Sequence, residues 1–426
     1  MLVTRKVRLL TSRIGFNCWR VSRFGYCLIG FPVAALLIAA SLVARRWVNF
    51  KVVPLNVSRF GHLLHDLDYR LTERDVLLGN RKPWFLVSPA RVDLPVASRL
   101  ALKIWRTQIR RRTRATWLPA FVGVPLTWAI SVMGLVPRLV VYNPKRIGAR
   151  FHAGSDVFGL TLDYPSNFQL SDKLMRKAKD QASQMGLDTE RAIACLHVRE
   201  NGYHAAHSRG LWVENMSFRN GDVEAVSLAA SALANSGYQV IRMGVNEHIP
   251  LSVADERTIF DFATNGFRSE LLDFYLVAKS RFLLSNGTGL DAAAQIFRKR
   301  IYNFGIIAPQ MLQIHRKFQI CMQVEEASSG KRFSLAESFR LPKLTDVTLA
   351  EHGLRLVPNT SEEIAELAME AVARDRGLWR LSAEQQRLQT RAIAILPSEF
   401  RRFAIRAGFG SGFLQRHPDW LNTSSS

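Results

Sequence analysis

Histidine, arginine and glutamate follow one another where an apolar run ends, in the stretch ACLHVRENGYHAAHSRG at residues 194–210. His197 and Arg199 stand two positions apart there, and Glu200 comes next. Arginine binds phosphate oxygens through charge-assisted hydrogen bonds, and histidine titrates near neutral pH. These residue types predict a site that holds a phosphorylated ligand and moves a proton.

Two later apolar runs also end in residues that suit an anion. YQVIRMG at 238–244 contains Arg242, and RFLLSNGTGL at 281–290 ends in a turn of small residues before a helix. Such a turn presents N–H groups to an anion. The turn consists of Ser285, Asn286, Gly287, Thr288 and Gly289.

Each of these residues also has a purely structural interpretation. Arg199 can form an ion pair with Glu200 or Asp222, and His197 can be a packed, hydrogen-bonded core residue. Glycines also make ordinary turns. The functional interpretation rests on the three run ends meeting at one place.

The order of the elements predicts that meeting. Strands at AIACLHV, YQVIRMG, RFLLSNG and IYNFG alternate with helical patterns at 222–236, 269–279 and 290–298. Strand and helix in alternation form a parallel sheet, whose ligands bind at the carboxyl ends of its strands. We therefore expect a doubly wound domain with one crevice.

The amino-terminal half shows the same alternation. KVVPLNV at 51–57 and WFLVSP at 84–89 are typical of short buried strands, and helical patterns follow each. A capped helix is expected near residue 360, with Thr360 or Ser361 as N-cap and Glu363 near the capping-box position. The chain is thus expected to hold two α/β domains and a helical tail.

A basic leader at 1–26 precedes an uncharged apolar run at 27–44. About 18 apolar residues are just enough to cross a bilayer, so we expect an uncleaved membrane anchor, with a buried core helix as the alternative. The second apolar run, 117–136, contains Pro119 and Pro125. We expect it to lie in a core or at an interface.

The net charge of +23 suits an anionic membrane, a phosphorylated ligand or a nucleic acid. The basic residues are dispersed, and no RNP, KH or helix-turn-helix signature accompanies them, so we expect no nucleic-acid partner. The four cysteines lack metal or redox spacing. Asp66 and Asp68 fall in a helical pattern, where a solvated face is expected, so no metal or other cofactor is predicted.

An ordered set of motifs resembles a bacterial family of glycosyltransferases associated with surface-polysaccharide synthesis. The motifs are HVRENGY, SFRNGDVEA, GYQVIRMG, IFDFATNGFRSELLDFYLVAKSRFLLSNGTGL and GLRLVPNTSEEI, and they span residues 188–375. The resemblance extends faintly to SRFGHLLHDLDY at 58–69. The HVR triplet is also similar to the His-x-Arg motif of the fucosyltransferase group, although Glu200, Asn201 and Gly202 replace that group's second Arg and its Asp-Lys pair.

The resemblance implies a GT-B-like α/β fold with two Rossmann-like parallel-sheet domains facing a crevice. The expected parts are a leader and anchor helix at 1–48, an acceptor-side domain at 49–165, a donor-binding domain at 166–358 and a helical tail at 359–426. The donor diphosphate and nucleotide would contact His197, Arg199, Arg242 and the turn at 285–289. Secondary site residues by motif position are Arg219, Asn220, Arg268, Glu270, Asp273, Arg59 and His62.

The sequence thus predicts a glycosyltransferase that moves a sugar from a nucleotide-sugar donor to a hydroxyl of a polysaccharide, glycolipid or lipid-linked acceptor. Glu200, His204 and His207 are the candidate bases for that hydroxyl. We expect the enzyme at the bacterial inner membrane, with its catalytic domains on the cytoplasmic face. The alternatives are a polysaccharide pyruvyltransferase and a nonenzymatic membrane-associated binding protein.

Overall fold

The computed structural model of the chain describes residues 50–132, 156–200 and 217–423, together with a few positions between 32 and 43. Short gaps in these ranges fall at 78–82, 91–94, 113, 157–158, 246–248, 256, 309, 315 and 402–404. The chain divides into two compact units, Met1–Gly154 and Ser155–Ser426. The domain boundary expected from the sequence, between residues 165 and 166, lies somewhat after this division between Gly154 and Ser155.

The first unit contains a parallel sheet in the order β1-β2-β3. Its elements are β1 (Phe50–Leu55), α2 (Phe60–Leu77), β2 (Trp84–Pro89), α3 (Arg99–Arg110), β3 (Ala115–Trp117) and α4 (Ala120–Val132). The two strands that the sequence predicted here are therefore confirmed. Helix α3 begins at N-cap Ser98, whose Oγ accepts a hydrogen bond from the Ala101 N–H at 3.0 Å.

Helix α2 carries polar side chains into the core of this unit. Asp68 has no exposed surface, and the Asp66 carboxylate accepts a hydrogen bond from His62 Nδ1 at 3.0 Å. The solvated face expected for these two aspartates is therefore wrong, because packing covers Asp68. Buried carboxylates need partners within the protein, and one turn of helix supplies His62 to Asp66.

The anchor expected at 27–44 lies mostly outside the described residues. Within the described part of the chain, no helix has both the length and the apolar character needed to span a bilayer. The second apolar run forms α4, with Pro125 inside the helix.

The second unit is built on a seven-stranded sheet in the order β12-β9-β8-β7-β4-β5-β6, with every described pair parallel. The strands are β4 (Ile193–His197), β5 (Gln239–Met243), β6 (Ile259–Phe260), β7 (Phe282–Ser285), β8 (Arg300–Ile306), β9 (Phe318–Cys321) and β12 (Gly408–Phe409). All residues of β4, β5 and β7 are buried. Continuous burial is typical of parallel strands covered on both faces.

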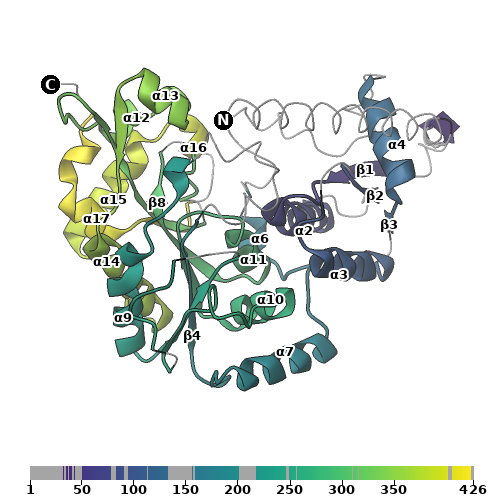
Figure 1. Cartoon of the computed structure of the whole chain (residues 1–426). Coiled ribbons are helices and arrows are strands. Elements are labelled where there is room, and N and C mark those ends of the chain that lie inside the picture. Colours follow the sequence, from purple (N-terminus) through teal and green to yellow (C-terminus); the bar gives the residue numbers. More distant parts are fainter. Residues whose placement is uncertain are drawn as a thin grey trace, which may run out of the picture. The chain divides into compact units, whose positions relative to one another are not determined.

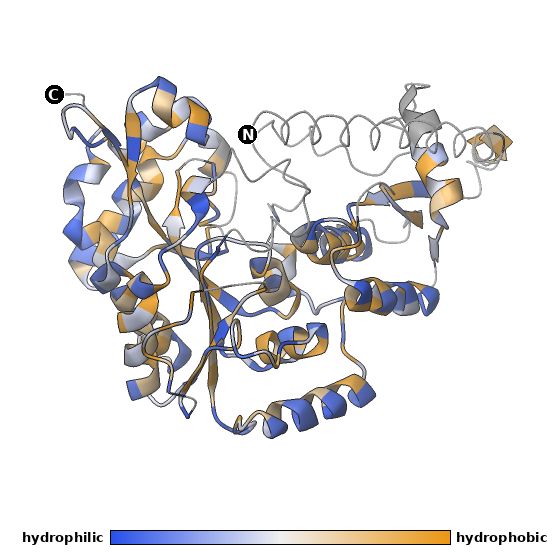
Figure 2. Ribbon diagram, in the orientation of Figure 1, coloured by the Kyte–Doolittle hydropathy of each residue, from blue (hydrophilic) through white to orange (hydrophobic). Residues whose placement is uncertain are grey.

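Helices cover both faces of this sheet (Figure 1). Helices α9 and α14 lie on one side, and α10 and α11 lie on the other. Hydrophobic residues follow the strands, and hydrophilic residues mark the outer face of α7 (Figure 2). The helices are α6 (Leu160–Asp163), α7 (Asp172–Gln184), α9 (Ser227–Asn235), α10 (Glu270–Lys279), α11 (Asp291–Ile296), α12 (Leu335–Ser338), α13 (Asp346–Glu351), α14 (Ser361–Asp375), α15 (Ala383–Ile395), α16 (Ser398–Arg401) and α17 (Ser411–Arg416).

Short elements complete the unit. An antiparallel hairpin pairs β10 (Gln323–Glu326) with β11 (Leu354–Val357). Turns of 3-10 helix are η4 (Ser217–Arg219), η5 (Glu224–Val226) and η6 (Pro418–Leu421). Strands β6, β9 and β12 and the hairpin were not predicted. The helix expected from residue 222 begins instead as η5, because the Asp222 carboxylate accepts a hydrogen bond from the Glu224 N–H at 2.9 Å.

The segment from residue 359 belongs to the second unit. Helix α14 has the expected capping box between Thr360 and Glu363. Strand β12 adds to the sheet beside β9, and Gln389 of α15 fixes it by donating to the Phe409 carbonyl at 2.5 Å. The expected helical tail is thus part of the same core.

Asn359 joins three of these elements through one buried amide. Its Oδ1 accepts a hydrogen bond from the Gly305 N–H of β8 at 2.8 Å. Its Nδ2 donates to the Cys321 carbonyl of β9 at 3.0 Å and to Glu363 of α14 at 2.8 Å. A buried polar group that is left without a partner destabilises the fold by more than its hydrogen bond normally stabilises it.

We expect Asn359→Ala to lower the free energy of unfolding of the second unit by about 2–3 kcal/mol, because it leaves several buried groups without a partner. Urea unfolding followed by circular dichroism measures the change. Asn422→Ala is the matched control, because the side chain of exposed Asn422 accepts a hydrogen bond from Arg391 at 2.9 Å and joins no described strands. Equal losses for the two variants contradict the role of Asn359.

Candidate active site

The ends of the predicted apolar runs lie side by side at the carboxyl edge of the large sheet. His197 of β4 is in register with Met243 of β5 on one side and with Ser285 of β7 on the other, and Ser285 is in register with Asn303 of β8. The chain winds outward from β4 to β5 and β6, then crosses to β7 and winds the other way. Ligands of open α/β sheets bind at such a reversal of strand order.

Asn286 ties three loops together at this point. Its Oδ1 accepts a hydrogen bond from the Arg199 N–H at 2.8 Å, and its Nδ2 donates to the Arg219 carbonyl at 3.2 Å. Arg219 donates in return from Nη2 to the Gly287 carbonyl at 2.7 Å. The predicted His-x-Arg segment, the Arg-Asn pair and the small-residue turn therefore meet.

Glycine is required in two of these loops. Gly287 has φ of 74°, and a Cβ there would lie 2.7 Å from Met311 Cε. Gly221 leaves room for the contact between loops, because a Cβ there would lie 2.7 Å from Val198 Cγ1 and 3.0 Å from Asn286 Nδ2. Larger residues would separate the loops that carry the two arginines.

Two arginines, Arg199 and Arg219, come together in these loops. Burial lowers the pKa of Arg199 to about 10, and the positive charge of Arg219 adds to this effect. Burial also lowers the pKa of Arg219. Asp346 partly offsets the repulsion and fixes the turn that carries Arg219, since its carboxylate accepts hydrogen bonds from the Ser217 N–H at 2.8 Å and the Phe218 N–H at 3.2 Å. A multiply charged anion would relieve the remaining repulsion.

The small-residue turn encloses a carboxylate of the protein itself. Asp291 accepts hydrogen bonds from Ser285 Oγ at 2.5 Å and Asn303 Nδ2 at 3.1 Å, and it pairs with Lys317 at 2.7 Å. Although burial raises the pKa of Asp291, these partners hold it below its usual value. The Thr288 N–H also faces this carboxylate, at 3.4 Å. The expected anion site at this turn is therefore partly filled by Asp291, while Gly289 continues into the helix.

Arg242 differs from its predicted role. Its side chain is fully buried, and it pairs with Glu200 at 2.6 Å and with Asp261 at 2.9 Å. It also donates to the Ile249 carbonyl at 2.6 Å. With no exposed surface, Arg242 holds two carboxylates in place, which corrects the prediction that it contacts a diphosphate. Glu200, predicted as a base, is one of those two carboxylates.

His197 is held as a neutral imidazole. Its Nδ1 lies 2.8 Å from the Met243 carbonyl, which only accepts hydrogen bonds, so the proton of the neutral ring lies on Nδ1 and Nε2 is the acceptor. Burial lowers the pKa of His197. The ring is therefore neutral at pH 7.

The other predicted residues have separate places. Arg268 and Asp273 form an ion pair at 2.5 Å at the start of α10, where Glu270 is the first helical residue. Asn220 closes the η4 turn with its N–H on the Ser217 carbonyl at 2.9 Å. Arg59 and His62 belong to the first unit. His204 and His207 lie outside the described residues.

Several residues that build the site were not predicted. Asp261, Asp291, Lys317, Asn303 and Asp346 become partners only when distant segments fold together. Asp291 falls in the helix expected at 290–298, and Asn303 falls in the strand expected at IYNFG. No spacing rule connects either residue to Lys317. In the described part of the chain, no group of three or more His, Cys, Asp or Glu could hold a metal ion. Metal independence stays a prediction.

No protein-family model matches the sequence, and no curated protein matches it. Among solved structures, the chain is similar to a glycosyl transferase family 9 protein from Veillonella parvula, with 10% identity and a TM-score of 0.41 over 76% of this chain and 97% of that one. It is also similar to the ADP-heptose LPS heptosyltransferase II of E. coli, with 13% identity and a TM-score of 0.40 over 77% and 100%. The function proposed below rests on residues of this chain, and the link to fucosyltransferases stays a prediction.

The Asp273 carboxyl gives the site a pH signature. Burial raises its pKa to about 6, against the opposing effect of Arg268. In the unfolded chain it titrates near 3.9, so the stability of the protein falls as pH rises from about 4 to about 6. We expect Asp273→Asn to raise the melting temperature relative to wild type at pH 7.5 and to lose most of that advantage at pH 4. Differential scanning calorimetry measures both values; Asp180→Asn, at an exposed position of α7, is the control, and an equal difference at both pH values contradicts the assignment.

Proposed function

We propose that the chain is a glycosyltransferase that transfers a sugar from a nucleotide-sugar donor to a hydroxyl of a polysaccharide, glycolipid or lipid-linked acceptor, without a metal ion. One observation carries the proposal: Arg199 and Arg219 converge with the turn at 285–289 at the point where the strand order reverses. Such a place in an α/β sheet is where nucleotide ligands bind.

In the proposed reaction the acceptor oxygen forms a bond to the anomeric carbon of the sugar. The bond from that carbon to the diphosphate oxygen breaks, and its electron pair leaves on the diphosphate. Arg199 and Arg219 stabilise the negative charge that develops on it through charge-assisted hydrogen bonds. Arginine has a raised affinity for phosphate where two guanidinium groups repel one another, because the anion removes that repulsion. The backbone of residues 285–289, fixed by Asp291, contacts the rest of the nucleotide.

We assign the base among the described residues to His197. Nε2 of its neutral ring can take the proton of the acceptor hydroxyl, and the Met243 carbonyl stabilises the imidazolium that forms. Glu200 is less suited, because its carboxylate is already neutralised by Arg242. Glu200 and Arg242 then position the segment that carries His197 and Arg199. His204 and His207 stay candidates of the sequence.

The acceptor side and the location are also part of the proposal. The resemblance assigns Arg59 and His62 of the first unit to the acceptor side. The net charge of +23 favours an anionic membrane surface, where lipid-linked or membrane-proximal acceptors meet a cytoplasmic donor. A topology reporter at the carboxyl terminus that is found outside the cytoplasm contradicts this location.

Arg199→Ala is expected to weaken the binding of nucleoside diphosphates at least tenfold, because a hydrogen bond to a charged group contributes about 1.5–3 kcal/mol. Calorimetric titration of the full chain with UDP, GDP and ADP measures the loss. Arg387→Ala is the control, since exposed Arg387 pairs with Glu384 on α15. Unchanged affinity in Arg199→Ala, with the melting temperature preserved, contradicts the proposal. Product analysis with sugar-nucleotide and pyruvyl donors separates sugar transfer from pyruvyl transfer.

His197 gives an expected pH profile. A reaction that needs neutral His197 loses kcat/KM as pH falls through the pKa of that residue, which burial places below the usual histidine value of about 6.5. We expect the acid limb of kcat/KM below pH 6.5. We also expect His197→Gln to lower kcat by about 10²–10⁴-fold while KM for the donor changes little. An unchanged acid limb in His197→Gln assigns the base elsewhere.

A further inference from the structure

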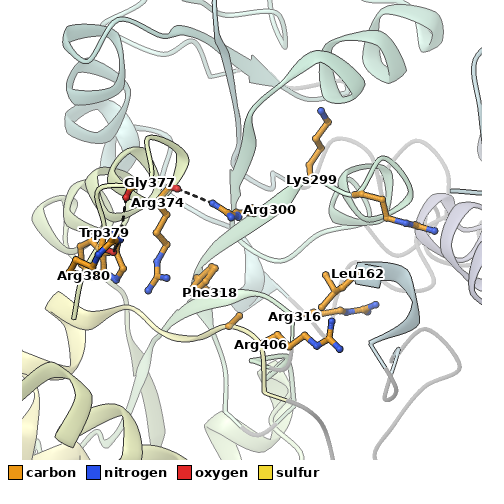
Figure 3. A pocket seen from close by; sticks show the side chains of 12 residues that line it. Leu162, Lys299, Arg300, Arg316, Phe318, Arg374, Gly377, Trp379, Arg380 and Arg406 are labelled. Carbon is orange, nitrogen blue, oxygen red and sulfur yellow. Dashed lines mark hydrogen bonds between the residues drawn. The ribbon is translucent and has the colours of Figure 1, made fainter. Parts of the chain in front are cut away.

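A second basic site lies at the opposite edge of the large sheet. A pocket of about 350 Å³ opens where β8 and β9 begin, beside the end of α14 (Figure 3). Its wall includes Arg300 at the first position of β8 and Phe318 at the first position of β9. Strand β8 rises about 3.3 Å per residue, so its carboxyl end lies about 20 Å away. A ligand in this pocket is therefore distinct from a donor at the carboxyl edge.

Seven of the side chains that line the pocket are basic, and none of its described lining residues is acidic. Arg298, Lys299 and Arg300 follow one another along the chain, and Arg316, Arg374, Arg380 and Arg406 complete the set. Figure 3 shows Arg374 and Arg380 on one side of Phe318 and Arg316 and Arg406 on the other, while the Lys299 side chain points away from them. The like charges that line the pocket repel one another, and an anion would offset that repulsion.

Backbone carbonyls hold several of these arginines. Arg298 donates to the carbonyls of Tyr164 at 2.7 Å and Gln295 at 2.9 Å. Arg300 donates to the Arg374 carbonyl at 3.0 Å, and Arg380 donates to the Trp379 carbonyl at 2.8 Å. A carbonyl accepts an N–H hydrogen bond but carries no net charge, so the bonds of Arg300 and Arg380 fix these two guanidinium groups without neutralising them.

Arg374 packs against two aromatic rings of the pocket. Its guanidinium carbon lies 4.1 Å from the centre of the Phe318 ring and 5.0 Å from that of Trp379. It also pairs with buried Glu370 at 2.8 Å, while Arg406 pairs with Asp163. The described lining of the pocket holds seven basic side chains and no acidic one, so positive charge is in excess along its wall. Side chains that are fixed before binding lose little entropy when a ligand arrives.

We propose that this pocket binds a small molecule that carries two or more phosphate groups. Its volume falls in the range of small-molecule sites and is too small for a folded partner. The planar guanidinium groups match phosphate oxygens in pairs, which a single ammonium group does not. This site goes beyond the proposed transfer reaction, because it uses no residue of the carboxyl edge.

Inorganic pyrophosphate is the probe, titrated into the full chain by calorimetry at constant ionic strength. The proposed donor site also suits a diphosphate, so we expect two sites in wild type and one in Arg199→Ala. The double variant Arg300→Gln/Arg380→Gln removes charge at two exposed pocket positions, while Arg298, which closes α11, stays intact. In the Arg199→Ala background, we expect it to weaken the remaining site at least tenfold.

The control double variant, Arg387→Gln/Arg391→Gln, removes the same charge from the exposed surface of α15 outside the pocket. We expect it to change pyrophosphate affinity less than twofold. If the two double variants weaken pyrophosphate binding equally, at preserved melting temperatures, the proposal that this pocket binds phosphate groups is wrong. Loss of a site in Arg300→Gln/Arg380→Gln but not in Arg199→Ala supports the pocket and contradicts the proposed donor site, so the two proposals fail separately.

Discussion

The buried pair of Asp291 and Lys317 is the interaction on which the candidate active site depends. A charge inside a protein is tolerated only with a partner and hydrogen bonds, because desolvation is so costly. The 2.7 Å pair meets this condition, with Ser285 and Asn303 completing the shell of Asp291. Since these partners come from β7, β8 and the segment before β9, the small-residue turn has little freedom of its own.

The two arginines of the site depend on that fixed turn. Asn286 can join the Arg199 loop to the Arg219 loop only because its own backbone is held beside Ser285 and Asp291. Burial, and in second place the repulsion by Arg219, lowers the pKa of Arg199 in this arrangement. Perturbed pKa values of this kind are characteristic of functional sites.

The sequence predicted the strands well, because continuous apolar runs and the turns after them are local signals. It also placed His197, Arg199 and Ser285 at one edge, since parallel strands align their carboxyl ends. It could not predict that Arg242 forms ion pairs with Glu200 and Asp261. An arginine in a sequence carries no signal that tells whether its guanidinium group will bind a ligand or a carboxylate. The short edge strands β6 and β12 were missed for a related reason: two residues carry no periodicity, and their pairing comes from the rest of the sheet.

The basic residues at the two edges of the sheet have different partners. The net charge of +23 does not show this difference, but the structure does. At the carboxyl edge, Glu200, Asp261, Asp291 and Asp346 lie beside the cations, so a leaving diphosphate would be stabilised without being trapped there. At the amino edge, carbonyl oxygens hold Arg300 and Arg380 in place without neutralising them. A site that must release its product benefits from carboxylates near its arginines, whereas a site that only binds does not need them. The proposed transfer site therefore includes carboxylates among its described residues, whereas the described lining of the proposed binding pocket has none; the count of basic residues alone does not show this difference.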